Sequence, residues 1–112
     1  MSRAWGLLVI AGLLEVAWAL GLKWSDGFDF RNKPAETVAT VLALVASFVL
    51  LAQATRTLPI GTAYAVWTGI GAAGAALGGI LLFGESVAPL RLMFLALLVI
   101  ALVGLKFSGG PS

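Results

Sequence analysis

The sequence predicts an all-α membrane protein whose 112 residues form a single domain, 1–112, with four transmembrane helices. Apolar residues make up 61% of the chain and charged residues 11%, and the mean hydropathy is +1.06, which is not the composition of a soluble domain. Charged and turn-forming residues divide the chain into four apolar segments, each near the ~20 residues that a spanning helix needs. We expect helices at about 5–22, 36–55, 61–83 and 87–107.

The first segment could be mistaken for a secretory signal peptide, because Arg3 precedes an apolar run. The apolar region of a signal peptide usually spans about 7–15 residues and ends at a small-residue cleavage site. This segment is longer, carries Glu15 and two tryptophans, and ends at Lys23. We therefore interpret it as a retained first helix.

Turn-forming residues separate the other three segments. The longest polar connection covers residues 26–34 and ends at Pro34, a residue favoured near the start of a helix. Residues 58–61 form a tight second turn, and residues 84–86 form a third, followed by Pro89 in the first turn of the last helix.

The residue types that are missing exclude several classes of function. The chain has no cysteine, which excludes disulfides, thiolate catalysis and cysteine metal sites, and it has no histidine, the usual zinc ligand. Proton exchange near physiological pH would therefore depend on a carboxyl group. We expect no metal site, no cofactor and no enzymatic activity. The net charge of +2 is spread over short flanks and loops, which does not favour nucleic-acid binding.

The basic residues do not favour one orientation in the membrane, because three of them lie on the side of the termini and four on the other. The two sets are Arg3, Arg56 and Lys106, and Lys23, Arg31, Lys33 and Arg91. The chain could therefore insert both ways round. The alternative is that local effects select a single orientation.

Glu15 is the most informative residue of the chain, because it lies eleventh in the 18-residue span 5–22. A charged side chain at the centre of a membrane helix costs roughly 2.5–3.5 kcal/mol on insertion scales, so such residues usually serve a function. On a helix, Glu15 shares a face with Gly12 and Trp18. A carboxylate and an aromatic face together suit a small cation. The alternative is that Glu15 only joins helices by a hydrogen bond, with Trp18 as a core or interfacial residue.

Two other predicted helices carry residues that could complete this site. In the third, Tyr64 and Trp67 stand above a stripe of glycines that includes Gly71 and Gly74, and the tyrosine could donate a hydrogen bond to a carboxylate. The glycines indicate close helix packing and a possible hinge. In the second, Ser47 could bond the Glu15 carboxyl or the carbonyl four residues before it in its own helix.

Four motifs together closely resemble the small multidrug resistance family over essentially the whole chain. They are EVAWALGLK at 15–23, LPIGTAYAVWTGIG at 58–71, FGES at 83–86 and GLK at 104–106. The sequence is similar to the guanidinium exporters of that family. Its polyaromatic-cation exporters typically have Gly-Thr in place of Ala17-Trp18 and a polar amide near Lys106.

This resemblance implies an antiparallel, dual-topology homodimer in the bacterial inner membrane that exchanges protons for a small guanidinium-type cation. It implies that Glu15 is the shared proton and substrate site, contributed once by each subunit. The pocket would be lined by Gly12, Trp18, Ser47, Tyr64 and Trp67. The partners would be the cation, protons, the lipid bilayer and a second copy of the chain. The connection 28–34 is longer and more charged than the family pattern, which leaves a fixed orientation with a paired partner as an alternative.

The physical chemistry of two glutamates in one cavity agrees with exchange. Two carboxyls in a dry site repel each other when both are ionised, so they titrate as one coupled unit. Protons and a cation then compete for the same charge. Two other functions stay open: a broad quaternary ammonium exporter with a wider pocket, and a non-transporting structural membrane subunit held together by Glu15 and the glycine stripe.

Overall fold

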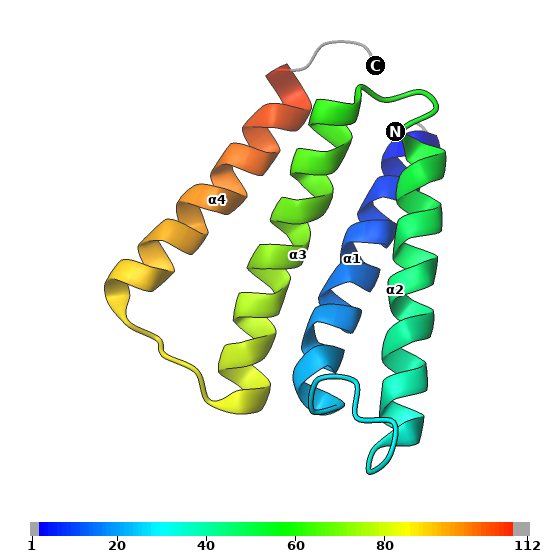
Figure 1. Ribbon diagram of the computed structural model, residues 1–112. Coiled ribbons are helices and arrows are strands. Elements are labelled where there is room, and N and C mark those ends of the chain that lie inside the picture. The colour runs from blue at the N-terminus through cyan, green and yellow to red at the C-terminus, as the bar shows by residue number, and fades with distance from the viewer. Residues whose placement is uncertain (1–2, 109–112) are drawn as a thin grey trace.

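The computed structural model describes residues 3–108 and arranges them as four α-helices (Figure 1). They are α1 (Arg3–Trp24), α2 (Pro34–Ala54), α3 (Ile60–Phe83) and α4 (Pro89–Ser108). Each is long and apolar enough to cross a membrane. The all-helical, four-span architecture predicted from the sequence is therefore confirmed. The start of α1 and the end of α4 lie at the same end of the bundle, as Figure 1 shows.

Proline and glycine set the helix ends in the second half of the chain. Gly84 adopts a left-handed conformation with φ +66°, which ends α3, and the next amide, from Glu85, donates to the Gly79 carbonyl at 3.2 Å. The fourth helix begins at Pro89 rather than at residue 87. Its late start follows from the restriction that a proline places on the residue before it, which disfavours the helical conformation there.

The connection between α1 and α2 is a compact, irregular turn. Asp26, Gly27 and Phe28 all have positive φ, at 51°, 73° and 66°. Such a conformation costs energy for the two residues that carry a side chain. The buried Ser25 holds it in place, because its Oγ accepts the Phe28 amide at 3.1 Å and donates to the Leu22 carbonyl at 3.4 Å.

Helix α1 makes the two most extensive helix contacts, with α2 and with α3, whereas the backbone of α4 lies close to that of α3 alone. The buried apolar core lies in the half of the bundle near the start of α1, where Leu8 and Ala11 are fully buried. None of the residues in α4 is buried, and in Figure 1 this helix leans away from the other three.

The glycines of α3 let α1 approach closely. A methyl group added at Gly71, Gly74 or Gly78 would overlap side chains of α1, respectively those of Glu15, Val16 and Leu20. These glycines therefore serve the close packing expected of small residues in membrane helices. Helix α3 runs without interruption from Ile60 to Phe83, and a hinge at Gly71 or Gly74 stays a prediction.

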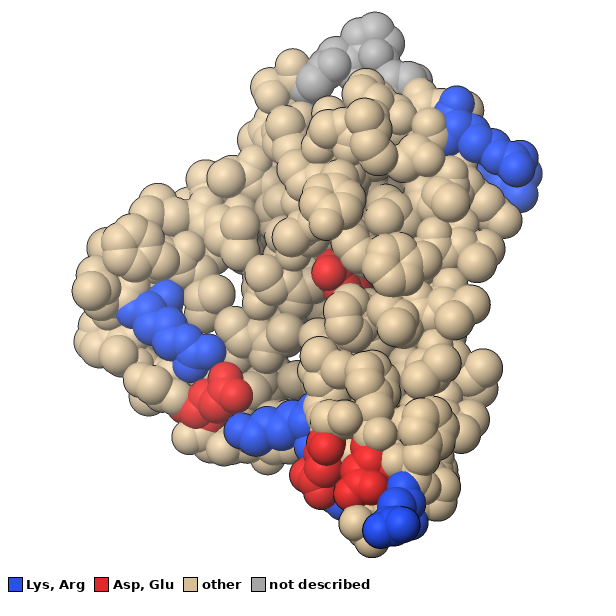
Figure 2. Space-filling view, in the orientation of Figure 1, with Lys and Arg blue, Asp and Glu red and all other residues tan. Residues whose placement is uncertain are grey.

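Charged side chains gather toward the ends of the helices. Figure 2 shows most of those on its visible face at the end that carries the α1–α2 and α3–α4 connections. There Glu85 accepts Arg91 at 3.2 Å and lies 4.0 Å from the Lys23 ammonium. Figure 2 also shows one isolated acidic surface at mid-height, surrounded by uncharged residues.

Candidate functional site

Glu15 lies near the middle of α1, with its side chain against α3. The carboxyl group occupies the space that a side chain at Gly71 would fill. Glu15 is half-buried, and its Oε1 is fully covered yet has no hydrogen-bond partner within residues 3–108. A covered carboxylate oxygen without a partner is costly. Such an oxygen can take up a proton or pair with a cation, and either one would relieve this cost.

Trp18 lies one turn further along α1 and has the same unusual property. The side chain is half-buried, and its Nε1 is covered without a hydrogen-bond acceptor among the described residues. An indole N–H can only donate, so its natural partner is an oxygen atom and not a cation. Glu15 and Trp18 therefore present an unused acceptor and an unused donor near each other on one helix.

Ser47 joins three helices instead of bonding to Glu15. Its Oγ donates to the Ala11 carbonyl of α1 at 2.7 Å and accepts the Nε1 of Trp67, from α3, at 2.9 Å. Both interactions predicted for Ser47, with the Glu15 carboxyl or with its own helix four residues back, are wrong. The reason is that Ser47 points at α1, whose Ala11 carbonyl has a free lone pair, one turn from Glu15. Thr40 is the residue of α2 that bonds four residues back, to the Glu36 carbonyl at 2.8 Å.

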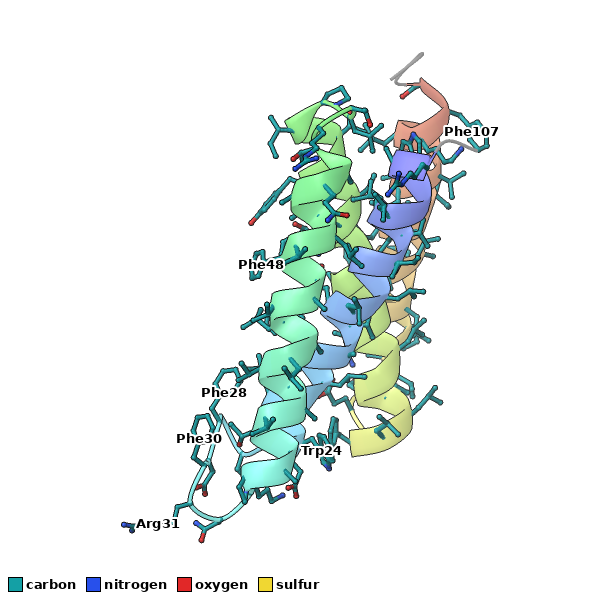
Figure 3. All side chains as sticks on the ribbon, turned by 90° about the vertical axis from the view of Figure 1, so that its right-hand side faces the viewer. Trp24, Phe28, Phe30, Arg31, Phe48 and Phe107 are labelled. Carbon is teal, nitrogen blue, oxygen red and sulfur yellow. The ribbon has the colours of Figure 1, made fainter. Side chains whose placement is uncertain are left out.

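Aromatic rings extend this network toward the surface of the subunit. The ring of Trp67 packs against Phe48 at 5.2 Å and against Tyr64 at 5.4 Å between centroids, both tilted. Tyr64 is 54% exposed, and within residues 3–108 no hydrogen bond links it to Glu15. The predicted hydrogen bond from Tyr64 to the carboxylate is thus absent from a single subunit. Figure 3 shows Phe48 projecting outward from α2.

Gly12 also contributes to the contact between α1 and α3. It is buried, and a methyl group there would meet the side chain of Ile70 at 2.8 Å. The two predicted glycine positions, Gly12 and Gly71, therefore bring the site-bearing face of α1 against α3. Sequence reasoning missed Ile70 and Phe48, because an apolar residue in an apolar helix carries no sign of which neighbour it meets.

The site contains no arrangement suited to a metal. Among the described residues, no group of three or more His, Cys, Asp or Glu side chains lies close enough together to hold an ion. The chemistry available is that of one carboxyl group, an indole N–H and aromatic faces. Groups of these kinds are chemically able to bind a cation or to take up a proton.

Comparison with known proteins finds the same family across most of the chain. The Small Multidrug Resistance protein family matches residues 3–98. The guanidinium exporter of Escherichia coli (strain K12) is 59% identical over 105 residues, which cover 94% of this chain and 97% of that protein. The guanidinium exporters of Citrobacter freundii and Salmonella typhimurium are 56% identical over the same share of each chain.

These matches confirm the resemblance that the four sequence motifs indicate. They agree with the four apolar helices, which make the chain a multi-pass membrane protein. Taken together, the helices, the mid-membrane carboxyl and the length of the match establish that this chain belongs to the small multidrug resistance family.

Proposed function

We propose that this protein exports guanidinium and small substituted guanidinium cations in exchange for protons, with Glu15 holding either the proton or the cation. The observation that carries the proposal is the Glu15 carboxyl, which lies mid-helix with a covered oxygen and no hydrogen-bond partner within residues 3–108. The relatives named guanidinium exporters support the choice of cation, since they match 94% of this chain.

The chemistry of guanidinium suits a carboxylate in a membrane. Guanidinium is planar and presents N–H donors in a fork that matches two carboxylate oxygens. It is also more weakly hydrated than an ammonium ion, which lowers the cost of leaving water. Because one carboxylate cannot hold a proton and pair with a cation at once, loading of either ligand excludes the other. This exclusion couples the two opposing fluxes without a second site.

We infer that the working unit is an antiparallel, dual-topology homodimer in the bacterial inner membrane. The unpartnered Nε1 of Trp18 supports a second subunit, since it needs an oxygen acceptor that the described part of its own chain does not supply. A second Glu15 would bring such an acceptor. Two copies would also bring their two Glu15 carboxyls into one shared cavity. Trp18, Tyr64 and Trp67 would then line the shared pocket, with Ser47 and Gly12 behind them.

Proton release and cation flux test the proposal directly. Purified protein should release protons when guanidinium is added, and proteoliposomes should carry guanidinium against a proton gradient. Glu15→Gln should abolish both, because the amide neither exchanges a proton nor carries charge. The matched control is Glu36→Gln, which removes a carboxyl in the first turn of α2 and should transport normally. A fully active Glu15→Gln variant would refute the mechanism.

The same measurements separate the alternatives. Preferential uptake of bulky quaternary ammonium or polyaromatic cations over guanidinium would point to a broad-specificity exporter. If the parent protein carries no cation and Glu15→Gln disrupts assembly instead, the protein would be a structural membrane subunit.

A further inference from the structure

A separate apolar cavity lies between α1, α3 and α4, apart from the Glu15 carboxyl. Its volume is about 490 Å³, and its lining includes Trp5 and Val16 of α1, Ile70 of α3, and Val103 and Lys106 of α4. The cavity exists because the backbone of α4 packs against α3 and stands away from that of α1, an arrangement visible in Figure 1. Among the described residues that line the cavity, Lys106 is the one that carries a charge.

The length of the cavity corresponds to one leaflet of a bilayer. Its lining on α1 runs from Trp5 to Val16, which spans roughly 16 Å at the helical rise of about 1.5 Å per residue. The hydrocarbon core of a bilayer is about 30 Å thick, so one leaflet contributes roughly half of that. The cavity thus begins at a helix end and stops near the middle of the membrane.

The cavity is large enough to receive an extended hydrocarbon chain. It offers about 490 Å³ along roughly 16 Å of α1, and its described lining is apolar except at Lys106.

The positive charge of Lys106 at the open end of the cavity indicates which lipid headgroup would carry the hydrocarbon chain. The Lys106 ammonium lies 5.2 Å from the ring centre of Trp5 and 4.8 Å from that of Phe107, and within residues 3–108 it pairs with no carboxylate. Acidic residues other than Glu15 lie near the opposite ends of the helices, at Asp26, Asp29, Glu36 and Glu85, whereas Arg3 and Arg56 share the end of Lys106.

We propose that this cavity binds one acyl chain of an anionic glycerophospholipid, with the lipid phosphate paired to Lys106. The apolar walls bury the acyl chain, and the ammonium stays at headgroup level beside two aromatic rings. A zwitterionic lipid fits less well, because no carboxylate lines the cavity to accept its cationic headgroup. Basic pockets between membrane helices bind anionic lipids in this manner.

Native mass spectrometry of the purified protein with equal amounts of phosphatidylglycerol and phosphatidylcholine tests this assignment. We expect the protein to retain more phosphatidylglycerol than phosphatidylcholine. Lys106→Gln should reduce the retention of phosphatidylglycerol about fivefold, which is the effect of losing one lysine contact at a membrane surface. Arg56→Gln is the matched control, because it removes a charge from the same end without altering the cavity, and it should keep the preference. Equal retention by the parent, Lys106→Gln and Arg56→Gln proteins would overturn the proposal.

A second pair of variants tests the cavity itself. Val103→Trp fills it and should abolish lipid retention, whereas Leu97→Trp adds the same ring to an exposed position of α4 outside the lining and should not. Because the chain has no cysteine of its own, Val103→Cys can be cross-linked without background. Efficient cross-linking between two such chains in the presence of lipid would show that a second copy occupies the cavity and would also overturn the proposal.

Discussion

Ser47 holds three helices together with a single hydroxyl group. It donates to the Ala11 carbonyl and accepts from the Nε1 of Trp67. The side chains of Ser47 and Trp67 are both buried. If the hydroxyl is removed, the indole N–H of Trp67 loses the one acceptor that it has within residues 3–108. A buried donor left without a partner costs more than the hydrogen bond contributed.

Ser47→Ala should therefore lower the free energy of unfolding by about 1–2 kcal/mol, within the range for interhelical bonds in membranes. Combining it with Trp67→Phe should cost less than the sum of the two single changes, because the second change removes the orphaned donor. Unfolding in detergent, measured for both single variants and the double variant, gives the coupling. Thr55→Ala, which removes an exposed bond at the end of α2, is the control. Strict additivity of the two changes would contradict the network.

Gly71 controls the position of the Glu15 carboxyl. A methyl group at Gly71 would occupy the place of the carboxyl oxygen and the two carbons behind it. Because the end of a glutamate side chain is flexible, it can rotate away at little cost. Gly71→Ala should thus reduce guanidinium flux strongly while changing stability little.

Flux into proteoliposomes and unfolding of the same sample distinguish these two effects. Gly104→Ala is the matched control, since a methyl group there meets nothing within 4 Å and a helical Gly→Ala change gains up to about 1 kcal/mol. Normal transport by Gly71→Ala would show that this contact does not position the carboxyl.

At the scale of elements, the connection between α1 and α2 contains a pH-sensitive turn. The Asp29 carboxylate accepts the Asn32 side chain at 2.9 Å and the amides of Asn32 and Arg31 at 3.0 and 3.1 Å. These bonds hold the pKa of Asp29 below its usual value, and the bond from the Asn32 side chain contributes most to the lowering. A carboxyl with a lowered pKa stabilises the turn at pH values above its unfolded pKa, and this contribution is lost as the pH falls through the folded pKa.

Asn32→Ala should accordingly raise the pKa of Asp29 toward its usual value, because the largest cause of the lowering is gone. An NMR titration of the Asp29 carboxyl in detergent micelles measures it directly. Asn32→Asp adds a negative charge beside the carboxyl and should raise the pKa further. An unchanged titration midpoint in both variants would show that the turn does not form in the membrane protein.

The helices themselves are joined by small residues at defined depths. Gly12 and Gly71 lie where α1 and α3 meet, and Gly21 meets the Thr40 side chain of α2. Lipid is as apolar as a helix, so burial alone does not draw membrane helices together. Close backbone approach provides dispersion contacts instead, and glycine permits that approach.

At the scale of the whole molecule, α4 is the helix that exposes most of its surface to the surroundings of the chain. It is the least covered helix, with no buried residue, so most of its surface is open to lipid or to another protein. If the protein inserts in both orientations, the α2–α3 and α3–α4 connections each face both sides of the membrane in a mixed population.

Single cysteines in those connections test the orientation. Thr57→Cys and Ser86→Cys each introduce the chain's only thiol at an exposed position. In intact cells, a membrane-impermeant maleimide should label about half of each population, because equal numbers of chains would point either way. Full labelling of one variant with protection of the other would show a fixed orientation instead.

Much of this architecture follows from the composition and from the charged and turn-forming residues that separate the apolar segments. The charged residues Lys23 and Lys33 enclose a turn, and Pro59 and Gly84 stand at the ends of α3. Glu15 could be placed at mid-membrane by counting along an apolar segment. The sequence could not predict the partners of Ser47 or the outward position of Tyr64, because each depends on how helices distant in sequence are rotated against one another.

The sequence by itself determined that this is a membrane protein of its family, with four helices able to cross a bilayer and one carboxyl midway along the first of them. These properties depend on residue type and spacing along one helix, which a sequence records directly. Only the tertiary structure decided that Gly71 faces Glu15, that Ser47 bridges α1 to Trp67 and that α4 leaves a cavity beside α1. The physical reason is that these helices are apolar on nearly every side, so hydropathy does not distinguish a face that meets protein from one that meets lipid.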